Sequence, residues 1–348
     1  MLERIFFRRN RNSEIDLPKD NFQKISKAKR ILLEVSSRPL SEQVLELSEE
    51  DILKSAKELE YPVYEKEIEE NLKVHSVILP IFENAITWLL KEEENRTPEY
   101  YVFARDCELI YDALYGIAKA GKNNLSERVH YLKTSIGMFE ESGKRNPKYF
   151  KGMGITKEKI KNGSLVFLDS GFRGSLFRKV SRTVGVKNLE EMRFRGYLMS
   201  EGYSHCSCKQ IEFHKEIDIK EKIKLQNQMK ASPYENWTEI QDFNELLCVF
   251  LQRMPKFTGR YVQTYKKQNG KWDVLPEAIK FIRLFGLNVK SNERCPRGEY
   301  KYDIRSKSKH YNDSVVDPVA SLLLQKATLE YFSNPNVYDR VYSRIGKI

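Results

Sequence analysis

The chain has 348 residues, of which 40% are hydrophobic and 31% are charged, so it can form a packed core in one large domain or two ordinary ones. This composition excludes a chain that is disordered throughout. The formal net charge of +11 suits polyanionic partners, which include nucleic acids and phosphorylated substrates, and it leaves nucleic-acid binding open.

The cysteines and the apolar runs indicate the cellular compartment of the protein. An odd, sparse set of cysteines argues against a disulfide framework and for a reducing compartment; they are Cys107, Cys206, Cys208, Cys248 and Cys295. Residues 1–12 are charged and lack the apolar stretch of a signal peptide. The longest apolar run, 246–251, is far shorter than a membrane span. We therefore expect a cytoplasmic protein without a membrane span.

Residues 1–95 form the first predicted region, and it is helical. Apolar residues recur at helical spacing from residue 41 to residue 95, while residues 1–30 are polar and basic. Ser48 and Asp51 have the spacing of a capping box, which predicts a helix start. Pro80 predicts either a kink or a second helix start.

Residues 96–200 alternate between short apolar runs and helical patterns. The predicted strands cover 100–104, 129–135, 164–170 and 193–200, and the predicted helices cover 107–121 and 175–185. The polar stretch 138–162 predicts a mobile loop with room for one helical turn. Alternating strands and helices indicate a parallel sheet with crossover connections. The predicted fold class is α/β, with a Rossmann-like parallel-sheet core between N-terminal and C-terminal helical extensions.

Residues 201–348 form a mixed, mostly helical third region. The predicted elements are an edge strand at 211–214 and helices at 243–254 and 276–286. Asp317 followed by Pro318 predicts another helix start.

Two predicted strands end in acids, Asp106 and Asp169, at the edge of the sheet where ligands bind in open parallel sheets. Each acid is followed by a helix, whose N-terminal amides and dipole favour phosphate. After Asp169, Gly171 and Gly174 allow the backbone to curl around an anion. The pattern predicts an anion site with an acid that grips a metal ion or sugar hydroxyls, although an aspartate here can also simply cap the next helix.

These residues resemble the type I phosphoribosyltransferases. In that family an apolar strand ends in acids that bind ribose hydroxyls, and a glycine-rich turn then holds the 5-phosphate of phosphoribosyl pyrophosphate. LVFLDSGFRGS (165–175) looks like this segment, and ARDCEL (104–109) takes the place of the loop that wraps the pyrophosphate. The chain departs from the family at Ser170, where a second acid is usual, and at Asp106 and Cys107, where glycines are usual.

The chain is also similar to proteins of bacterial capsule and glycan gene clusters that are labelled haloacid-dehalogenase-like. Those proteins pair an aromatic-rich strand ending in Arg-Asp-Gly with a later Asp-x-Gly-x-x-Gly-Ser segment. Residues 88–106 and 168–175 look like that pairing. Some members are thought to use phosphoribosyl pyrophosphate as a glycosyl donor.

The resemblance implies an enzyme that binds phosphoribosyl pyrophosphate with Mg²⁺ and transfers the phosphoribosyl group to an unknown acceptor. It implies catalytic roles for Asp169, Asp106 and Arg105, with Asp106 and Asp169 also at the metal. The expected substrate-binding residues are Ser170, Gly171, Phe172, Arg173, Gly174, Ser175, Glu108, Thr134 and Ser135.

Two alternatives of other classes stay open. The first is a haloacid-dehalogenase-like, Mg²⁺-dependent phosphatase with Asp106 as nucleophile and Glu108 as second acid; Thr134 or Ser135 would then bind phosphate, and Asp169 would hold the metal. The second is a non-catalytic nucleotide-binding or RNA-binding protein on a decayed enzyme core, which the missing second acid favours.

A short segment rich in His and Cys also suggests a zinc site. The segment holds His205, Cys206, Cys208 and His214, but its spacing differs from that of most structural zinc sites. A reduced, inert cysteine pair explains the segment as well.

Overall fold

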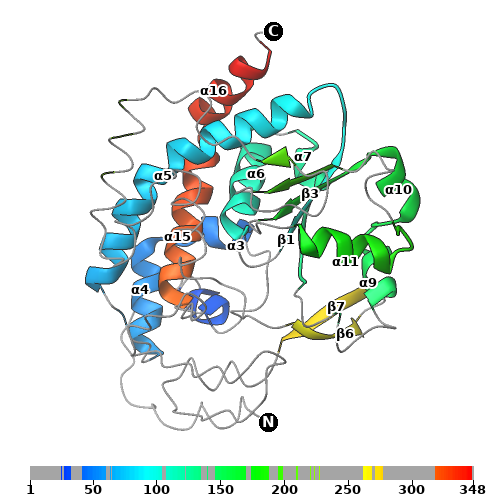
Figure 1. Cartoon of the computed structure of the whole chain (residues 1–348). Helices are drawn as coiled ribbons and strands as arrows, with labels where there is room; N and C mark the ends of the chain where they lie inside the picture. Colours follow the sequence, from blue (N-terminus) through cyan, green and yellow to red (C-terminus); the bar gives the residue numbers. More distant parts are fainter. Residues whose placement is uncertain are drawn as a thin grey trace.

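In the computed structural model, the centre of the molecule is a parallel β-sheet with the strand order β2-β1-β3-β4-β5 (Figure 1). All four neighbouring strand pairs are parallel. The strands are β1 (Glu99–Phe103), β2 (Val129–Leu132), β3 (Leu165–Asp169), β4 (Arg195–Leu198) and β5 (Lys209–Gln210). The predicted α/β class is therefore confirmed.

The structure describes residues 25, 27–32, 41–59, 63, 65–103, 107–121, 123–134, 139, 146–169, 174–187, 195–198, 209–210, 220, 223, 227, 262–268, 271–276 and 318–346.

The two central strands are covered on both faces. In β1, Tyr100 and Val102 belong to one hydrophobic core, and Tyr101 and Phe103 belong to another. Successive side chains of a strand point to opposite faces, so the two cores lie on the two sides of the sheet. This double burial explains why the strands read as continuous apolar runs.

Helix α6 (Glu108–Gly121), which follows β1, covers the first face of the sheet together with α5 (Glu65–Glu92), α15 (Pro318–Phe332) and α16 (Pro335–Ile345). Helices α6 and α15 are in close contact: a Cβ atom built on Gly116 would lie 2.7 Å from Cβ of Phe332. The C-terminal helices are therefore part of the layer that packs on the sheet.

The second face is covered by three shorter helices, α9 (Asn146–Gly152), α10 (Lys157–Asn162) and α11 (Ser175–Thr183). Two of them lie in the stretch 138–162, so the prediction of a mobile loop with one turn is wrong. In this stretch, the side chains of Tyr149, Phe150 and Ile160 are buried in the core on the second face. These apolar residues lie among lysines in the sequence, and their burial packs both helices against the sheet.

The N-terminal helices α3 (Ser41–Leu45) and α4 (Glu49–Glu58) pack with α15 around a separate core. The predicted capping box is confirmed, because Ser48 Oγ accepts a bond from the Asp51 amide and the Asp51 carboxylate accepts one from the Ser48 amide. Pro80 lies inside α5, not at a helix start.

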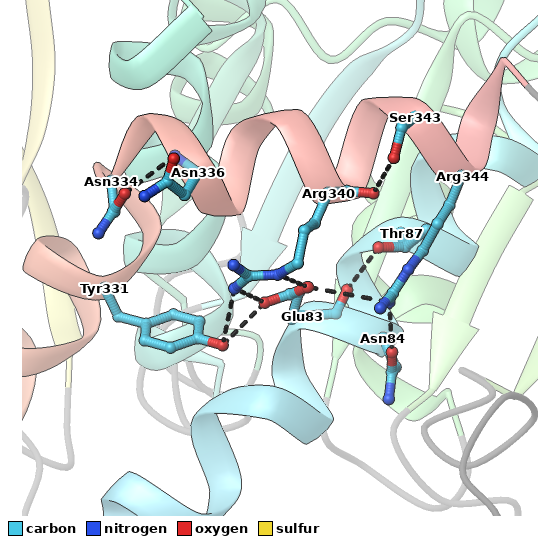
Figure 2. Close-up of polar contacts among 9 residues, drawn as sticks. All are labelled: Glu83, Asn84, Thr87, Tyr331, Asn334, Asn336, Arg340, Ser343 and Arg344. Atoms are coloured by element: carbon cyan, nitrogen blue, oxygen red, sulfur yellow. Dashed lines mark hydrogen bonds and ion pairs between the residues drawn. The ribbon is translucent and has the colours of Figure 1, made fainter.

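One buried carboxylate ties α16 to α5 (Figure 2). Glu83 is 4% exposed, and Arg340 donates to both of its oxygens, over 2.9 Å from Nε and 2.7 Å from an amino group. Tyr331 Oη donates to the same carboxylate over 2.7 Å, and an Arg344 nitrogen lies 3.8 Å from it. Burial alone would raise the pKa of Glu83, but the bonds from Arg340 and Tyr331 together hold it below its usual value. Glu83 is thus ionised, and its bonds hold α16 against α5.

Other described elements are the short helix α7 (Leu125–Arg128) and an antiparallel hairpin of β6 (Val262–Gln268) and β7 (Lys271–Pro276). The hairpin was not predicted, although Asn269-Gly270 between its strands is a strong hairpin signal. Helix α15 begins at Pro318 as predicted. The predicted strand 211–214, the helix 243–254 and the helix 276–286 beyond Pro276 lie outside the described residues.

Among the helices that the structure describes, none has the length and apolar character required to cross a membrane.

Candidate functional site

The connections after β1 and β3 leave the sheet toward opposite faces. The chain leaves β1 for α6 on the first face, and it leaves β3 for α11 on the second face. Strands β1 and β3 are neighbours, so the chain diverges between them at their carboxyl ends. In open parallel sheets a ligand binds in the crevice at such a switch point. The topology therefore gives one preferred place for a site, and Asp169 at the end of β3 lies beside it.

Asp169 is the last residue of β3 and lies at this place. Asp169 is 8% exposed, and it follows four buried apolar residues of the same strand. An aspartate in such a position costs free energy unless its carboxylate is bonded or serves a ligand. The predicted position of Asp169 at the end of a buried strand is confirmed, and its role at ribose hydroxyls or at a metal ion stays a prediction.

The turn before α11 ends in a residue with left-handed backbone. Gly174 has φ +61° and ψ 22°, directly before Ser175, the first residue of the helix. A residue with a Cβ atom is strained in this conformation, which accounts for glycine here. No side chain caps the helix, because Gly174 has none to offer. Gly174 itself therefore offers no acceptor to the first amides of α11, and helix N-terminal amides of this kind favour an anion.

On the β1 side, the structure places Glu108 at the first turn of α6, and the residue is 4% exposed. Tyr131 Oη donates to its carboxylate over 2.6 Å, and Tyr131 lies on β2 opposite Val102 of β1. No role was predicted for Tyr131. The only signal for it was the alternation of buried residues along β2.

Thr134 follows β2 by two residues, beyond the same carboxyl edge. It is 5% exposed, and its hydroxyl has no hydrogen-bond partner among the described residues. Buried hydroxyls are nearly always bonded, so an unpartnered one marks a place for a ligand or a water molecule. Strands β2 and β3 both pair with β1, so their ends lie about 10 Å apart, which is within the span of a sugar phosphate.

The other predicted site residues lie outside the described residues. They are Arg105, Asp106, Ser135, Ser170, Gly171, Phe172 and Arg173. The segment with His205, Cys206, Cys208 and His214 also lies outside them. Within the described part of the chain, no group of three or more His, Cys, Asp or Glu side chains is placed to hold a metal ion. The described oxygens of Asp169 and Thr134 are hard donors of the kind that Mg²⁺ prefers.

Comparisons with models of known protein families, with curated proteins and with solved structures found no match to this chain.

Proposed function

We propose that the protein is a Mg²⁺-dependent enzyme of the phosphoribosyltransferase type, which binds phosphoribosyl pyrophosphate at the switch point between β1 and β3. One observation carries the proposal: a buried aspartate ends β3, and helix α11 then begins at the same edge after a left-handed glycine that has no side chain to cap it. The aspartate supplies acceptors for ribose hydroxyls, and the helix amides supply donors for the 5-phosphate.

In this proposal the residues have separate tasks. The Asp169 carboxylate accepts hydrogen bonds from the ribose hydroxyls. The amides of 171–175 and the Ser175 hydroxyl bind the 5-phosphate. Arg105 faces the pyrophosphate, and Asp106 and Asp169 hold Mg²⁺, whose charge offsets that of the pyrophosphate. The bond between ribose C1 and the pyrophosphate oxygen breaks, and the oxygen keeps the electron pair. The acceptor forms the new bond to C1 and releases its proton. Such catalysis depends on positioning and on stabilising the leaving charge.

A calorimetric titration of phosphoribosyl pyrophosphate with Mg²⁺ tests the proposal. We expect micromolar binding to the wild type and at least a 30-fold loss, about 2 kcal/mol, in Asp169→Asn. Asp339→Asn is the matched control, because Asp339 is exposed on α16 and far from this edge. No binding to the wild type, or equal binding to Asp169→Asn, would overturn the proposal.

A second candidate, the haloacid-dehalogenase-like phosphatase, is favoured by Thr134, because that chemistry uses a hydroxyl after the second strand to bind phosphate. Against it, the Glu108 carboxylate that would serve as second acid already accepts a bond from Tyr131. Phosphate release from p-nitrophenyl phosphate that is lost in Asp106→Asn would support this candidate. Absence of release by the wild type would contradict it.

A further inference from the structure

The three helices on the second face of the sheet form one continuous outer surface. Lys179 Nζ of α11 lies 5.5 Å from the centre of the Phe139 ring, which itself stacks on Phe150 of α9. A Cβ atom built on Gly185, just after α11, would lie 3.8 Å from Cδ of Lys157 at the start of α10. Figure 1 shows α9, α10 and α11 together on the side away from α4 and α5.

This surface is strongly basic. The cations that define it, called the basic face below, are Lys151, Lys157, Lys161, Arg178, Arg182 and Lys187. Arg178 is half-buried and the other five are exposed. Glu158 is the one acid within the described helices α9, α10 and α11. In the described part of the chain none of the six forms an ion pair, whereas the neighbouring Lys159 pairs with Glu99.

The opposite helical layer has the reverse charge. Helix α4 has four acidic and two basic residues, and α5 has six acidic and three basic residues. The charge of the described helices is therefore unevenly spread, and α9, α10 and α11 hold an excess of positive charge. Separated charge of this kind attracts a polyanion to one side of a molecule.

We propose that the basic face binds double-stranded nucleic acid through its backbone phosphates. Lysine and arginine are the groups that neutralise phosphates and release their counterions, and here six of them share the surface with one acid, Glu158. Single strands are held by exposed aromatic rings on which bases stack, and α9, α10 and α11 expose no ring, since Tyr149, Phe150 and Phe177 are buried. Contacts of this type are independent of sequence, because base edges are not read.

The proposal does not rest on the proposed transferase function. The basic face is made by the outer sides of three helices and by Lys187 just after α11, whereas the candidate site lies at the carboxyl edge of the sheet. Failure of phosphoribosyl pyrophosphate to bind would leave the basic face unaffected, and loss of nucleic-acid binding would leave the transferase proposal in place.

Fluorescence anisotropy with a labelled duplex DNA of about 20 base pairs, at increasing salt, tests the proposal. We expect the logarithm of the association constant to fall linearly with that of the salt concentration, with a slope of about −4 to −5 for five phosphate contacts. In the triple variant Lys151→Glu, Lys161→Glu and Lys187→Glu we expect at least a 10-fold loss of affinity and a shallower slope.

The control is a triple variant with the same change of net charge elsewhere, Lys54→Glu, Arg96→Glu and Lys119→Glu, and it should bind within about 2-fold of the wild type. All six positions are on described surface, so circular dichroism melting should show both triples folded. Equal loss in both triples would overturn the proposal. So would tighter binding of a single strand than of the duplex, or binding of an anionic polysaccharide by a protein that does not bind duplex.

Discussion

Glu83 contributes to stability through a set of bonds that joins α5 to α15 and α16. Its carboxylate takes two bonds from Arg340 and one from Tyr331, and it is 4% exposed (Figure 2). Glu83→Gln keeps the shape but removes the charge that these donors serve. We expect the free energy of unfolding to fall by about 2 kcal/mol, at the lower end for buried pairs because Arg340 is half exposed.

Urea denaturation of the wild type and of Glu83→Gln measures this difference. Asp339→Asn, an exposed change on the same helix as Arg340, should stay within about 0.5 kcal/mol of the wild type. Equal stability of Glu83→Gln and the wild type would show that the bonds to α16 contribute nothing net.

His75 is a second buried group whose chemistry can be worked out from its neighbours. Its Nε2 lies 2.7 Å from Thr328 Oγ1, and that hydroxyl donates its own proton to the Leu324 carbonyl over 2.9 Å. The hydroxyl must therefore accept from Nε2–H, so the neutral ring carries its proton on Nε2. Burial lowers the pKa of His75 to about 3.

This lowered pKa makes stability depend on pH with a definite sign. The unfolded chain takes up the proton near pH 6.5 and the folded chain does not, so stability is full above about pH 6.5 and falls as the pH drops toward 3. We expect the wild type to lose about 2 kcal/mol more than His75→Gln between pH 7 and pH 5. Urea denaturation of both proteins at pH 7 and pH 5 measures this difference. An equal loss of stability in the wild type and in His75→Gln would contradict the lowered pKa of His75.

At the scale of the element, the contact between α6 and α15 depends on a missing side chain. A Cβ atom on Gly116 would lie 2.7 Å from Cβ of Phe332 and 3.1 Å from its backbone carbonyl carbon. Gly116→Ala would gain up to about 1 kcal/mol in helix propensity if there were room. Since backbone atoms cannot give way cheaply, we expect a net loss of about 1–3 kcal/mol. Thermal unfolding measures the sign, and a higher melting temperature would refute this account of the packing.

The elements also show what the sequence could and could not predict. Strands β1 and β3 were predicted because strands buried on both faces read as apolar runs bounded by turns, and β2 and β4 were predicted from the alternation of strands and helices along the chain. Helices α9 and α10 were missed because they are short, and lysines surround the few apolar residues that they bury. Contacts such as Glu83 with Arg340 join residues more than 200 positions apart, and no local pattern can indicate them.

At the scale of the whole molecule, the candidate site was predicted in part. The position of Asp169 at the end of a buried strand followed from the sequence, because an acid after an apolar run and before a glycine turn is a local pattern. The unpartnered hydroxyl of Thr134 and the bond from Tyr131 to Glu108 depend on strand pairing, so they required the structure. The charge of the second face likewise emerged only when three separate helices were seen on one side.

The central claim is that a phosphorylated ligand binds at the switch point between β1 and β3. Hydrogen–deuterium exchange with saturating phosphoribosyl pyrophosphate and Mg²⁺ tests it most directly. We expect slower exchange in peptides covering 100–110 and 165–178, with no change in α16. Unchanged exchange in both peptides, or slower exchange confined to other parts of the chain, would contradict it.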